Sequence, residues 1–231
     1  MYPVTVILPA YNEAGNIEAS LKDVASAFPL AQIVVVDDGS QDDTAARTTS
    51  LQGKHPNIQL IRNQTNQGKG YSLRQGVEAS HGKMVAFLDS DGDIAASECK
   101  KLVDLLLSEP SIDIAIGTKR GAESLRTGSR SRFRSLARNL GNRWIQFLLL
   151  PGITDTQCGV KAFRGDIVRS IAPRTQMDRW SFDIELLALA RRGGYRIREE
   201  PVQWRETGKS HVNWLGYLST FVDVCRIYFR L

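Results

Sequence analysis

The 231-residue sequence contains few cysteines, no excess of glycine or proline, and no long apolar run. Its three cysteines (Cys99, Cys158 and Cys225) are odd in number and far apart, which excludes a disulfide framework or a zinc site and favours a reducing compartment. Without a stretch of about 18 apolar residues, no standard transmembrane helix is expected, and no secretory leader is evident. With 42% hydrophobic residues, the chain is too apolar to be disordered. The sequence therefore predicts a folded protein with one sizeable core.

Basic residues are scarce in the first half of the chain and abundant in the second. Residues 1–115 contain 9 Lys and Arg against 15 Asp and Glu, whereas residues 116–231 contain 21 against 10. The net charge of +5 hides this division. A basic half could serve nucleic acid, an anionic membrane surface or a phosphorylated substrate.

Short apolar runs alternate with helical patterns through the first half. The apolar runs are Val4–Leu8, Ile33–Val36, Ile58–Ile61, Met84–Leu88 and Ile112–Ile116. The helical patterns are Glu13–Ala27, Gln41–Ser50, Lys69–Ala79 and Ser97–Leu107. Continuous apolar runs are typical of strands buried on both faces, and their alternation with helices predicts a doubly wound α/β sheet.

The second half has a different pattern. A loop is expected at Ala122–Arg132, followed by an amphipathic helix at Phe133–Leu150. A helix at Phe182–Arg192, a strand at Ile197–Trp204 and a final helix at Val212–Leu231 complete the chain. No linker is long enough to divide the chain, so a single domain over residues 1–231 is expected.

Acidic residues follow the fourth expected strand at alternate positions: Asp89, Asp91 and Asp93. Ligands of an open α/β sheet bind beyond the carboxyl ends of the strands. Carboxylates placed there can share Mg²⁺ or Mn²⁺, which would bridge them to a diphosphate. The alternative is a turn rich in Asp and Gly, but the position after a buried strand favours a metal site.

The second strand is followed by Asp37 and Asp38. These carboxylates could accept hydrogen bonds from a nucleotide base or ribose, or they could form a helix-capping turn. Two other nucleotide motifs are missing, since the sequence has neither a strand–GxGxxG–helix unit nor a Walker A loop.

A basic stretch lies between Lys119 and Arg143. Its basic residues are Lys119, Arg120, Arg126, Arg130, Arg132, Arg134, Arg138 and Arg143, against one acid, Glu123. Arginine suits bidentate capture of phosphate, and beside an amphipathic helix it also suits an anionic membrane. A solvated helix face is the plain alternative, and no nucleic-acid-binding motif accompanies the charge.

Several short motifs follow one another along the chain. In order they are Val6–Glu13 (VILPAYNE), Val35–Ser40 (VVDDGS), Asn66–Gly70 (NQGKG) and Phe87–Asp91 (FLDSD). Together they resemble the inverting family-two glycosyltransferases with the GT-A fold. Three further motifs are Thr154–Phe163 (TDTQCGVKAF), Phe182–Leu187 (FDIELL) and Gly208–Ser210 (GKS). They resemble the branch that moves sugars onto dolichyl or polyprenyl phosphate, particularly its glucosyltransferases.

The resemblance covers most of the chain and implies its fold class. It implies an α/β GT-A fold with a mainly parallel sheet between helices, and with basic amphipathic helices in the C-terminal half. Residues 1–117 would bind the nucleotide sugar. Residues 118–231 would bind the acceptor and face the membrane.

The resemblance also implies roles for individual residues. Those implied for the nucleotide sugar are Pro9, Tyr11, Glu13, Asp37, Asp38, Lys69, Asp89, Ser90, Asp91 and Arg205. Asp89 and Asp91 would hold the metal, with Asp93 as a third ligand two residues after Asp91, where many relatives have glutamine. Those implied for the acceptor phosphate are Arg120, Arg134 and Arg138. Asp155 matches a position proposed as the base in relatives, so it and Asp91 are the candidate catalytic residues.

The leading hypothesis is transfer of a hexose, with glucose from UDP-glucose favoured, to a polyprenyl or dolichyl phosphate with Mg²⁺ or Mn²⁺. A phosphate monoester is largely dianionic near pH 7, so it needs charge neutralisation and placement more than a base. The enzyme would lie in the cytoplasm, peripheral on the cytoplasmic face of an anionic membrane, with no nucleic-acid partner. Two alternatives stay open: a glycosyltransferase with a polysaccharide or small-molecule acceptor, and a non-catalytic module that binds membrane or nucleic acid.

Overall fold

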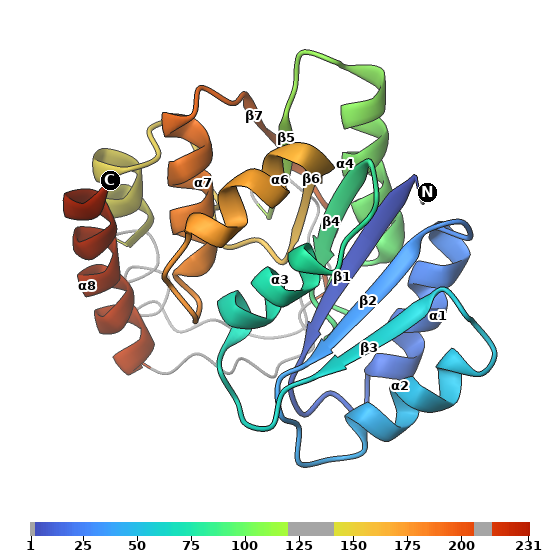
Figure 1. Ribbon diagram of the computed structural model, residues 1–231. Coiled ribbons are helices and arrows are strands. Elements are labelled where there is room, and N and C mark those ends of the chain that lie inside the picture. Colours follow the sequence, from blue (N-terminus) through green and yellow to red (C-terminus); the bar gives the residue numbers. More distant parts are fainter. Residues whose placement is uncertain (1–2, 120–140, 206–213) are drawn as a thin grey trace.

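The computed structural model describes residues 3–119, 141–205 and 214–231 (Figure 1). Within these residues, seven strands form one sheet in the order β3-β2-β1-β4-β6-β5-β7. The strands are β1 (Val4–Ala10), β2 (Gln32–Asp37), β3 (Ile58–Arg62), β4 (Met84–Leu88), β5 (Ile114–Thr118), β6 (Val160–Arg164) and β7 (Ile197–Pro201). The helices are α1 (Ile17–Ala27), α2 (Thr44–Gln52), α3 (Lys69–Glu78), α4 (Ala96–Ser108), α6 (Gly165–Ile171), α7 (Phe182–Arg192) and α8 (Trp214–Arg230), with a 3-10 helix at Ala172–Arg174 and a helix over residues 141–148.

Most strand pairs are parallel. β1 pairs in parallel with β2 and β4, β2 with β3, and β5 with β7. β6 is the exception, because it runs antiparallel to both β4 and β5. The strands β1, β2 and β4 therefore end at the same edge of the sheet, and the loops that follow them meet there.

Helices cover both faces of the sheet (Figure 1), and alternate side chains of the strands pack against opposite layers. In β1, Val6 and Leu8 join a core that includes residues of α1 and α4, whereas Ile7 between them joins a second core with residues of α3 and α7. A strand buried on both faces has no side chain that must face water, which explains the continuous apolar runs. The predicted mainly parallel sheet between two layers of helices is confirmed.

The elements expected in the first half are present, with changes at their ends. The strand expected from Ile112 begins at Ile114, because the N–H of Ile112 closes a turn by donating to the Glu109 carbonyl oxygen (3.0 Å). The helix expected from Glu13 begins at Ile17, because residues 13–16 form a turn in which the Glu13 carbonyl oxygen accepts the N–H of Asn16 (2.9 Å).

The second half contains three elements that no sequence pattern predicts: strand β6, helix α6 and the 3-10 helix at Ala172–Arg174. The helix expected at Phe182–Arg192 has those bounds, the final helix is present as α8, and the strand expected to reach Trp204 ends at Pro201. The loop predicted at Ala122–Arg132 lies outside the described residues. So does the first part of the helix predicted at Phe133–Leu150, of which residues 141–148 are helical.

α8 and the helix of residues 141–148 lie side by side next to α7 (Figure 1). The rings of Trp144 and Phe221 stack with their centroids 4.8 Å apart, and Val224 and Ile227 of α8 are buried in the core shared with α7. Among the helices that the structure describes, none is long and apolar enough to span a bilayer.

Candidate active site

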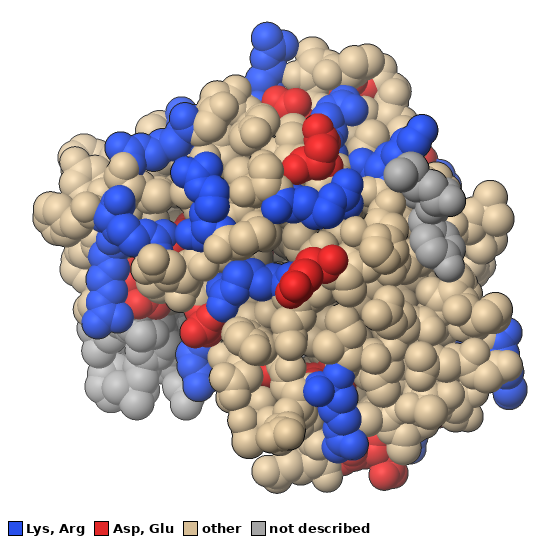
Figure 2. Space-filling model, in the orientation of Figure 1, with Lys and Arg blue, Asp and Glu red and all other residues tan. Residues whose placement is uncertain are grey.

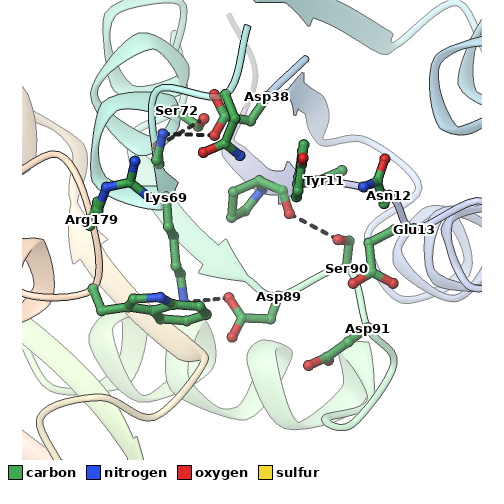
Figure 3. Close-up of a pocket in the computed structure, with 15 residues that line it drawn as sticks. Tyr11, Asn12, Glu13, Asp38, Lys69, Ser72, Asp89, Ser90, Asp91 and Arg179 are labelled. Atoms are coloured by element: carbon green, nitrogen blue, oxygen red, sulfur yellow. Dashed lines mark hydrogen bonds and ion pairs between the residues drawn. The ribbon is translucent and has the colours of Figure 1, made fainter. Parts of the chain in front are cut away.

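A cavity of about 370 Å³ opens where β1, β2 and β4 end (Figure 3). The residues that line it are Pro9, Ala10, Tyr11, Asn12, Glu13, Asp38, Asn66, Gly68, Lys69, Ser72, Asp89, Ser90, Asp91, Arg179 and Trp180. Ser90 Oγ donates a hydrogen bond to the Pro9 carbonyl oxygen (2.9 Å), which joins the loop after β4 to the end of β1. This is the edge at which open α/β sheets bind ligands.

Hydrogen bonds between the loops after β1 and β2 fix one wall of the cavity. The N–H of Asn12 donates to Ser40 Oγ (2.9 Å), and the N–H of Glu13 donates to Thr44 Oγ1 at the start of α2 (2.8 Å). Asn12 has a φ of 55°, a left-handed conformation that asparagine tolerates better than most residues. These contacts hold Tyr11 and Glu13, both predicted from the sequence, at the cavity.

Asp38 lines the cavity and also anchors the loop that leads into α3. Its carboxylate accepts hydrogen bonds from the Asn63 side chain (2.8 Å) and from the N–H groups of Gln67 (2.9 Å) and Gly68 (2.7 Å). The side chain is buried, so these three bonds compensate the loss of water around its charge. Asp38 therefore sets the position from which Lys69 enters the cavity.

Asp37 is adjacent to the cavity but is not among the residues that line it. Its fully buried carboxylate accepts the N–H of Ser40 (3.1 Å) and pairs with Arg62 Nε of β3 (3.2 Å). In the structure, Asp37 thus supports the turn after β2, and its role in binding the nucleotide sugar stays a prediction.

Lys69 and Asp89 form a largely buried ion pair inside the cavity. Lys69 Nζ lies 2.6 Å from Asp89 Oδ1 and 5.5 Å from the centroid of the Trp180 ring. Burial alone would lower the pKa of Lys69, but the charges of Asp89 and then Asp183 outweigh burial and raise the pKa above its ordinary value. Lys69 therefore stays charged and neutralises one carboxylate of the predicted metal site.

The second carboxylate of that site, Asp91, has an excess of negative charge around it. Burial raises the pKa of Asp91 to about 6, and the neighbouring charges of Asp89, Asp93 and Glu13 act in the same direction. The N–H of Asp93 donates to Asp91 Oδ1 (3.0 Å), which fixes the carboxylate and opposes the shift. A cation at this position would relieve the repulsion.

Asp93 and Arg205 line a neighbouring hollow and not the main cavity. The N–H of Arg205 donates to the Asp93 carbonyl oxygen (2.8 Å). Across the described ranges, no three Asp, Glu, His or Cys side chains gather closely enough to hold a metal ion between them. A metal bound at Asp89 and Asp91 would therefore take further ligands from a bound diphosphate.

Arg179 and Trp180 line the cavity although the sequence analysis does not point to them. They belong to the segment before α7, which approaches the start of α3 closely at Gly70. A Cβ at Gly70 would lie 2.5 Å from the Met177 carbonyl oxygen and 2.5 Å from Phe182 Cβ, so the approach requires glycine. The glycine in the NQGKG motif signals a close contact here, but nothing in the sequence names the partner.

A buried ion pair joins two of the sequence motifs behind the cavity. Lys161 of β6 lies 2.8 Å from Asp183 of α7 (Nζ–Oδ1), and its ammonium also donates to the Cys158 carbonyl oxygen (2.7 Å). Both side chains are almost inaccessible, so loss of either would leave an uncompensated charge. The pair supports the backbone next to the cavity, where the Gly159 carbonyl oxygen accepts the N–H of Asp89 (3.0 Å).

Asp155 lies in the loop that carries Gly159, outside the cavity lining. Its Oδ2 accepts the N–H of Lys119 after β5 (3.0 Å), and its own N–H donates to Glu199 Oε1 of β7 (2.9 Å). The predicted acceptor residues Arg120, Arg134 and Arg138 lie outside the described residues.

Comparison with known proteins identifies the family. Residues 5–171 match the sequence profile described as Glycosyl transferase family 2. The chain belongs to this family. A dolichyl-phosphate beta-glucosyltransferase of Trichomonas vaginalis is 32% identical over 240 residues, which cover 98% of this chain and 71% of the relative. Another from Dictyostelium discoideum is 31% identical over 245 residues and covers 98% and 74%. The protein is a glycosyltransferase, as predicted.

A solved structure gives the same result for the fold. Glucosyl-3-phosphoglycerate synthase from Mycobacterium tuberculosis, crystallised with Mn²⁺, UDP-glucose and phosphoglyceric acid, matches with a TM-score of 0.72 at 22% identity. The match covers 99% of this chain and 79% of that chain. The predicted glycosyltransferase fold is confirmed.

Proposed function

We propose that this family-two glycosyltransferase transfers glucose from UDP-glucose to dolichyl or another polyprenyl phosphate, with inversion and with the help of a divalent metal. The observation that carries the proposal is similarity over nearly the whole chain to dolichyl-phosphate beta-glucosyltransferases, at 32% and 31% identity. The cavity supports it, because it combines a fixed polar wall with paired carboxylates and a buried cation.

The donor would occupy the cavity. Its nucleotide would lie along the wall formed by Pro9, Tyr11, Glu13 and Asp38, and its diphosphate would lie toward Ser90 and Asp91. The N-terminus of α3 adds partial positive charge to the cavity, and the ammonium of Lys69, the first residue of α3, adds a full positive charge. Arg205, beside the neighbouring hollow, stays a predicted donor contact.

A divalent metal fits the residues at Asp89 and Asp91. Carboxylate oxygens are the ligands that Mg²⁺ and Mn²⁺ prefer. The raised pKa of Asp91 reflects burial first and the negative charge of Asp89 second, and a cation would neutralise that charge. When bound, the metal would stabilise the charge that develops on the departing UDP. Asp93 fixes Asp91 through its N–H group. Its carboxylate is a third ligand predicted from the sequence, but among the described residues it does not gather with those of Asp89 and Asp91, so a bound diphosphate is the proposed source of the remaining ligands.

The acceptor phosphate would need positioning and charge neutralisation. The predicted ligands are Arg120, Arg134 and Arg138. Asp155 holds the backbone of Lys119, the residue directly before Arg120, by accepting its N–H. We therefore infer that Asp155 orients the basic segment, because an acceptor that is already dianionic does not need a base.

We also propose that the protein rests on the cytoplasmic face of an anionic membrane through its aromatic patch. The patch lies on α8 and the helix of residues 141–148, and it comprises Phe147, Phe221, Val222, Tyr228 and Phe229, which are between 48% and 85% exposed. Exposed arginines on these helices and on α7 are Arg143, Arg191, Arg192, Arg226 and Arg230. Figure 2 shows basic side chains gathered on this side of the molecule. Apolar insertion with a basic rim is how interfacial helices bind anionic lipid.

The test is a transfer assay with separated donors and acceptors. With Mn²⁺ and radiolabelled UDP-glucose, we expect label to enter the organic phase when a polyprenyl phosphate is added, and not when a chelator removes the metal. The anomeric proton coupling of the product should show a β linkage. Equal transfer to a water-soluble phosphate ester would favour the small-molecule alternative, and absence of turnover with every donor would contradict the proposal.

A further inference from the structure

Trp180 places an aromatic ring in the cavity beside the Lys69–Asp89 ion pair. The side chain is 44% exposed, and the ammonium of Lys69 lies 5.5 Å from the ring centroid. Figure 3 shows Lys69 and Arg179 on one side of the cavity and Tyr11 and Glu13 on the other. The ring therefore belongs to the side away from the proposed nucleotide wall.

The segment that carries this tryptophan is held from three helices. Arg74 of α3 donates to the Met177 carbonyl oxygen (3.0 Å), and Glu185 of α7 accepts the N–H of Met177 (2.7 Å). Ser181, the residue directly after the tryptophan, donates to Asp223 Oδ2 of α8 (2.7 Å). The backbone on both sides of Trp180 is thus fixed before any ligand arrives, which lowers the entropic cost of binding.

The chemistry of this side of the cavity matches a hexose. A pyranose has a face made largely of C–H groups and a rim of hydroxyl groups. An aromatic ring covers the first, while carboxylates and cations exchange hydrogen bonds with the second. Trp180 supplies the ring, Asp89 an acceptor, and Lys69 and Arg179 are donors.

We infer that Trp180 packs against the hexose ring of the bound donor and contributes to its recognition. The inference rests on the proposed function, because the position of the nucleotide at Tyr11 and Asp38 leaves the side of Asp89, Lys69 and Trp180 for the sugar. It adds a sugar-binding residue that no sequence motif of the chain indicates.

The experiment compares UDP-glucose with UDP by titration calorimetry, with Mn²⁺ present and without membranes. Trp180→Leu should weaken UDP-glucose binding about threefold to tenfold and leave UDP binding unchanged, since only the former has a sugar to stack. Trp180→Phe keeps an aromatic face and should restore most of the difference. Trp144→Phe is the matched control, because Trp144 stacks on Phe221 and does not line the cavity.

Tryptophan fluorescence gives a second readout. UDP-glucose should change the emission of the wild-type protein and of Trp144→Phe, and the change should be lost in Trp180→Phe. An equal loss of UDP and UDP-glucose binding in Trp180→Leu, or no loss of either, would overturn the sugar contact. If the wild-type protein does not bind UDP-glucose, the proposed function itself fails.

Discussion

Asp91 is a carboxylate whose ionisation works against folding. Its pKa is raised from the ordinary value of 3.8 to about 6, by burial first and by the charge of Asp89 second. Between these two pKa values the folded chain keeps a proton that the unfolded chain has released. The free energy of unfolding therefore falls as pH rises through this window, and the loss is complete above pH 6.

Asp91→Asn should consequently stabilise the metal-free protein at neutral pH. We expect a melting temperature about 2 to 4 °C above that of the wild type, because the variant cannot ionise, and this advantage should vanish below about pH 4. The same variant should lose turnover with UDP-glucose and Mn²⁺. Thermal scans across pH, with and without Mn²⁺ and UDP, check both effects. A variant with near-normal turnover would show that Asp91 does not hold the metal.

Gly159 controls the position of the other carboxylate. A Cβ at this residue would lie 2.3 Å from Asp89 Oδ2, so Gly159→Ala must displace Asp89 from Lys69. A shift of about 1 Å in a catalytic group can lower the rate about a hundredfold, and we expect kcat to fall by this order. Gly141→Ala is the control, since no atom lies within 4 Å of its added Cβ. Unchanged turnover in Gly159→Ala would show that the pair tolerates displacement.

Most residues on the acidic, nucleotide-facing side of the cavity can be predicted from the sequence. They directly follow strands that are recognisable as continuous apolar runs. Tyr11, Glu13, Asp38, Asp89 and Asp91 all line the cavity, and their binding roles stay predictions. Arg179 and Trp180 come from an irregular segment with no periodicity. They reach the cavity through a tertiary contact at a glycine, which a local pattern does not encode.

Sequence patterns predict those strands whose side chains are all in the same environment, that is, buried on both faces of the sheet. β1, β2 and β4 are buried on both faces and read as continuous apolar runs. The sequence pattern does not predict β6, because Lys161 lies within this strand and lysine is rarely buried. Its partner Asp183 is on another element, so the compensation is visible only in the folded chain.

α8 is joined to the core by a buried charge. Glu185 is completely buried, and its carboxylate forms an ion pair with Arg230 of α8 while accepting the N–H of Met177. Arg230→Met should leave this carboxylate without its cation and lower the free energy of unfolding by about 3 kcal/mol. Arg226→Met is the matched control, because the Arg226 side chain is 70% exposed and its pair with Asp223 is long at 3.8 Å. Pairs with an exposed partner contribute about 1 kcal/mol or less. Urea denaturation measures the free energy of unfolding of both variants. An equal loss in the two would show that the Glu185–Arg230 pair stabilises the protein no more than the Arg226–Asp223 pair does.

At the scale of the whole molecule, the basic and acidic halves of the sequence contribute to two different surfaces of the protein. The basic half carries α8 and the helix of residues 141–148, whose aromatic patch is exposed. The acidic half contributes the carboxylates of the cavity. The two surfaces suit the two proposed substrates, one dissolved in water and one held in a bilayer.

The aromatic patch should govern binding to vesicles. Phe147→Ser combined with Phe229→Ser should weaken association with anionic vesicles about tenfold or more, because two exposed rings lose their insertion into lipid. Leu30→Ser is the control, since Leu30 is 75% exposed but lies outside the patch. Sedimentation with vesicles measures the effect, and added salt should weaken the remaining binding through the arginines. Equal binding by all three proteins would contradict a membrane role for the patch.

The antiparallel insertion of β6 has a consequence for the order of folding. β1, β2, β3 and β4 can pair as soon as the first 88 residues are available, with helices as short crossovers. Among the strands that the structure describes, β5 pairs only with β6 and β7, so it has no described neighbour in the growing sheet until residues 160–164 close a long loop. Such distant pairings form slowly because loop closure precedes any gain in contacts. In pulsed hydrogen exchange during refolding, amides of β1 and β2 should become protected before those of β5 and β7.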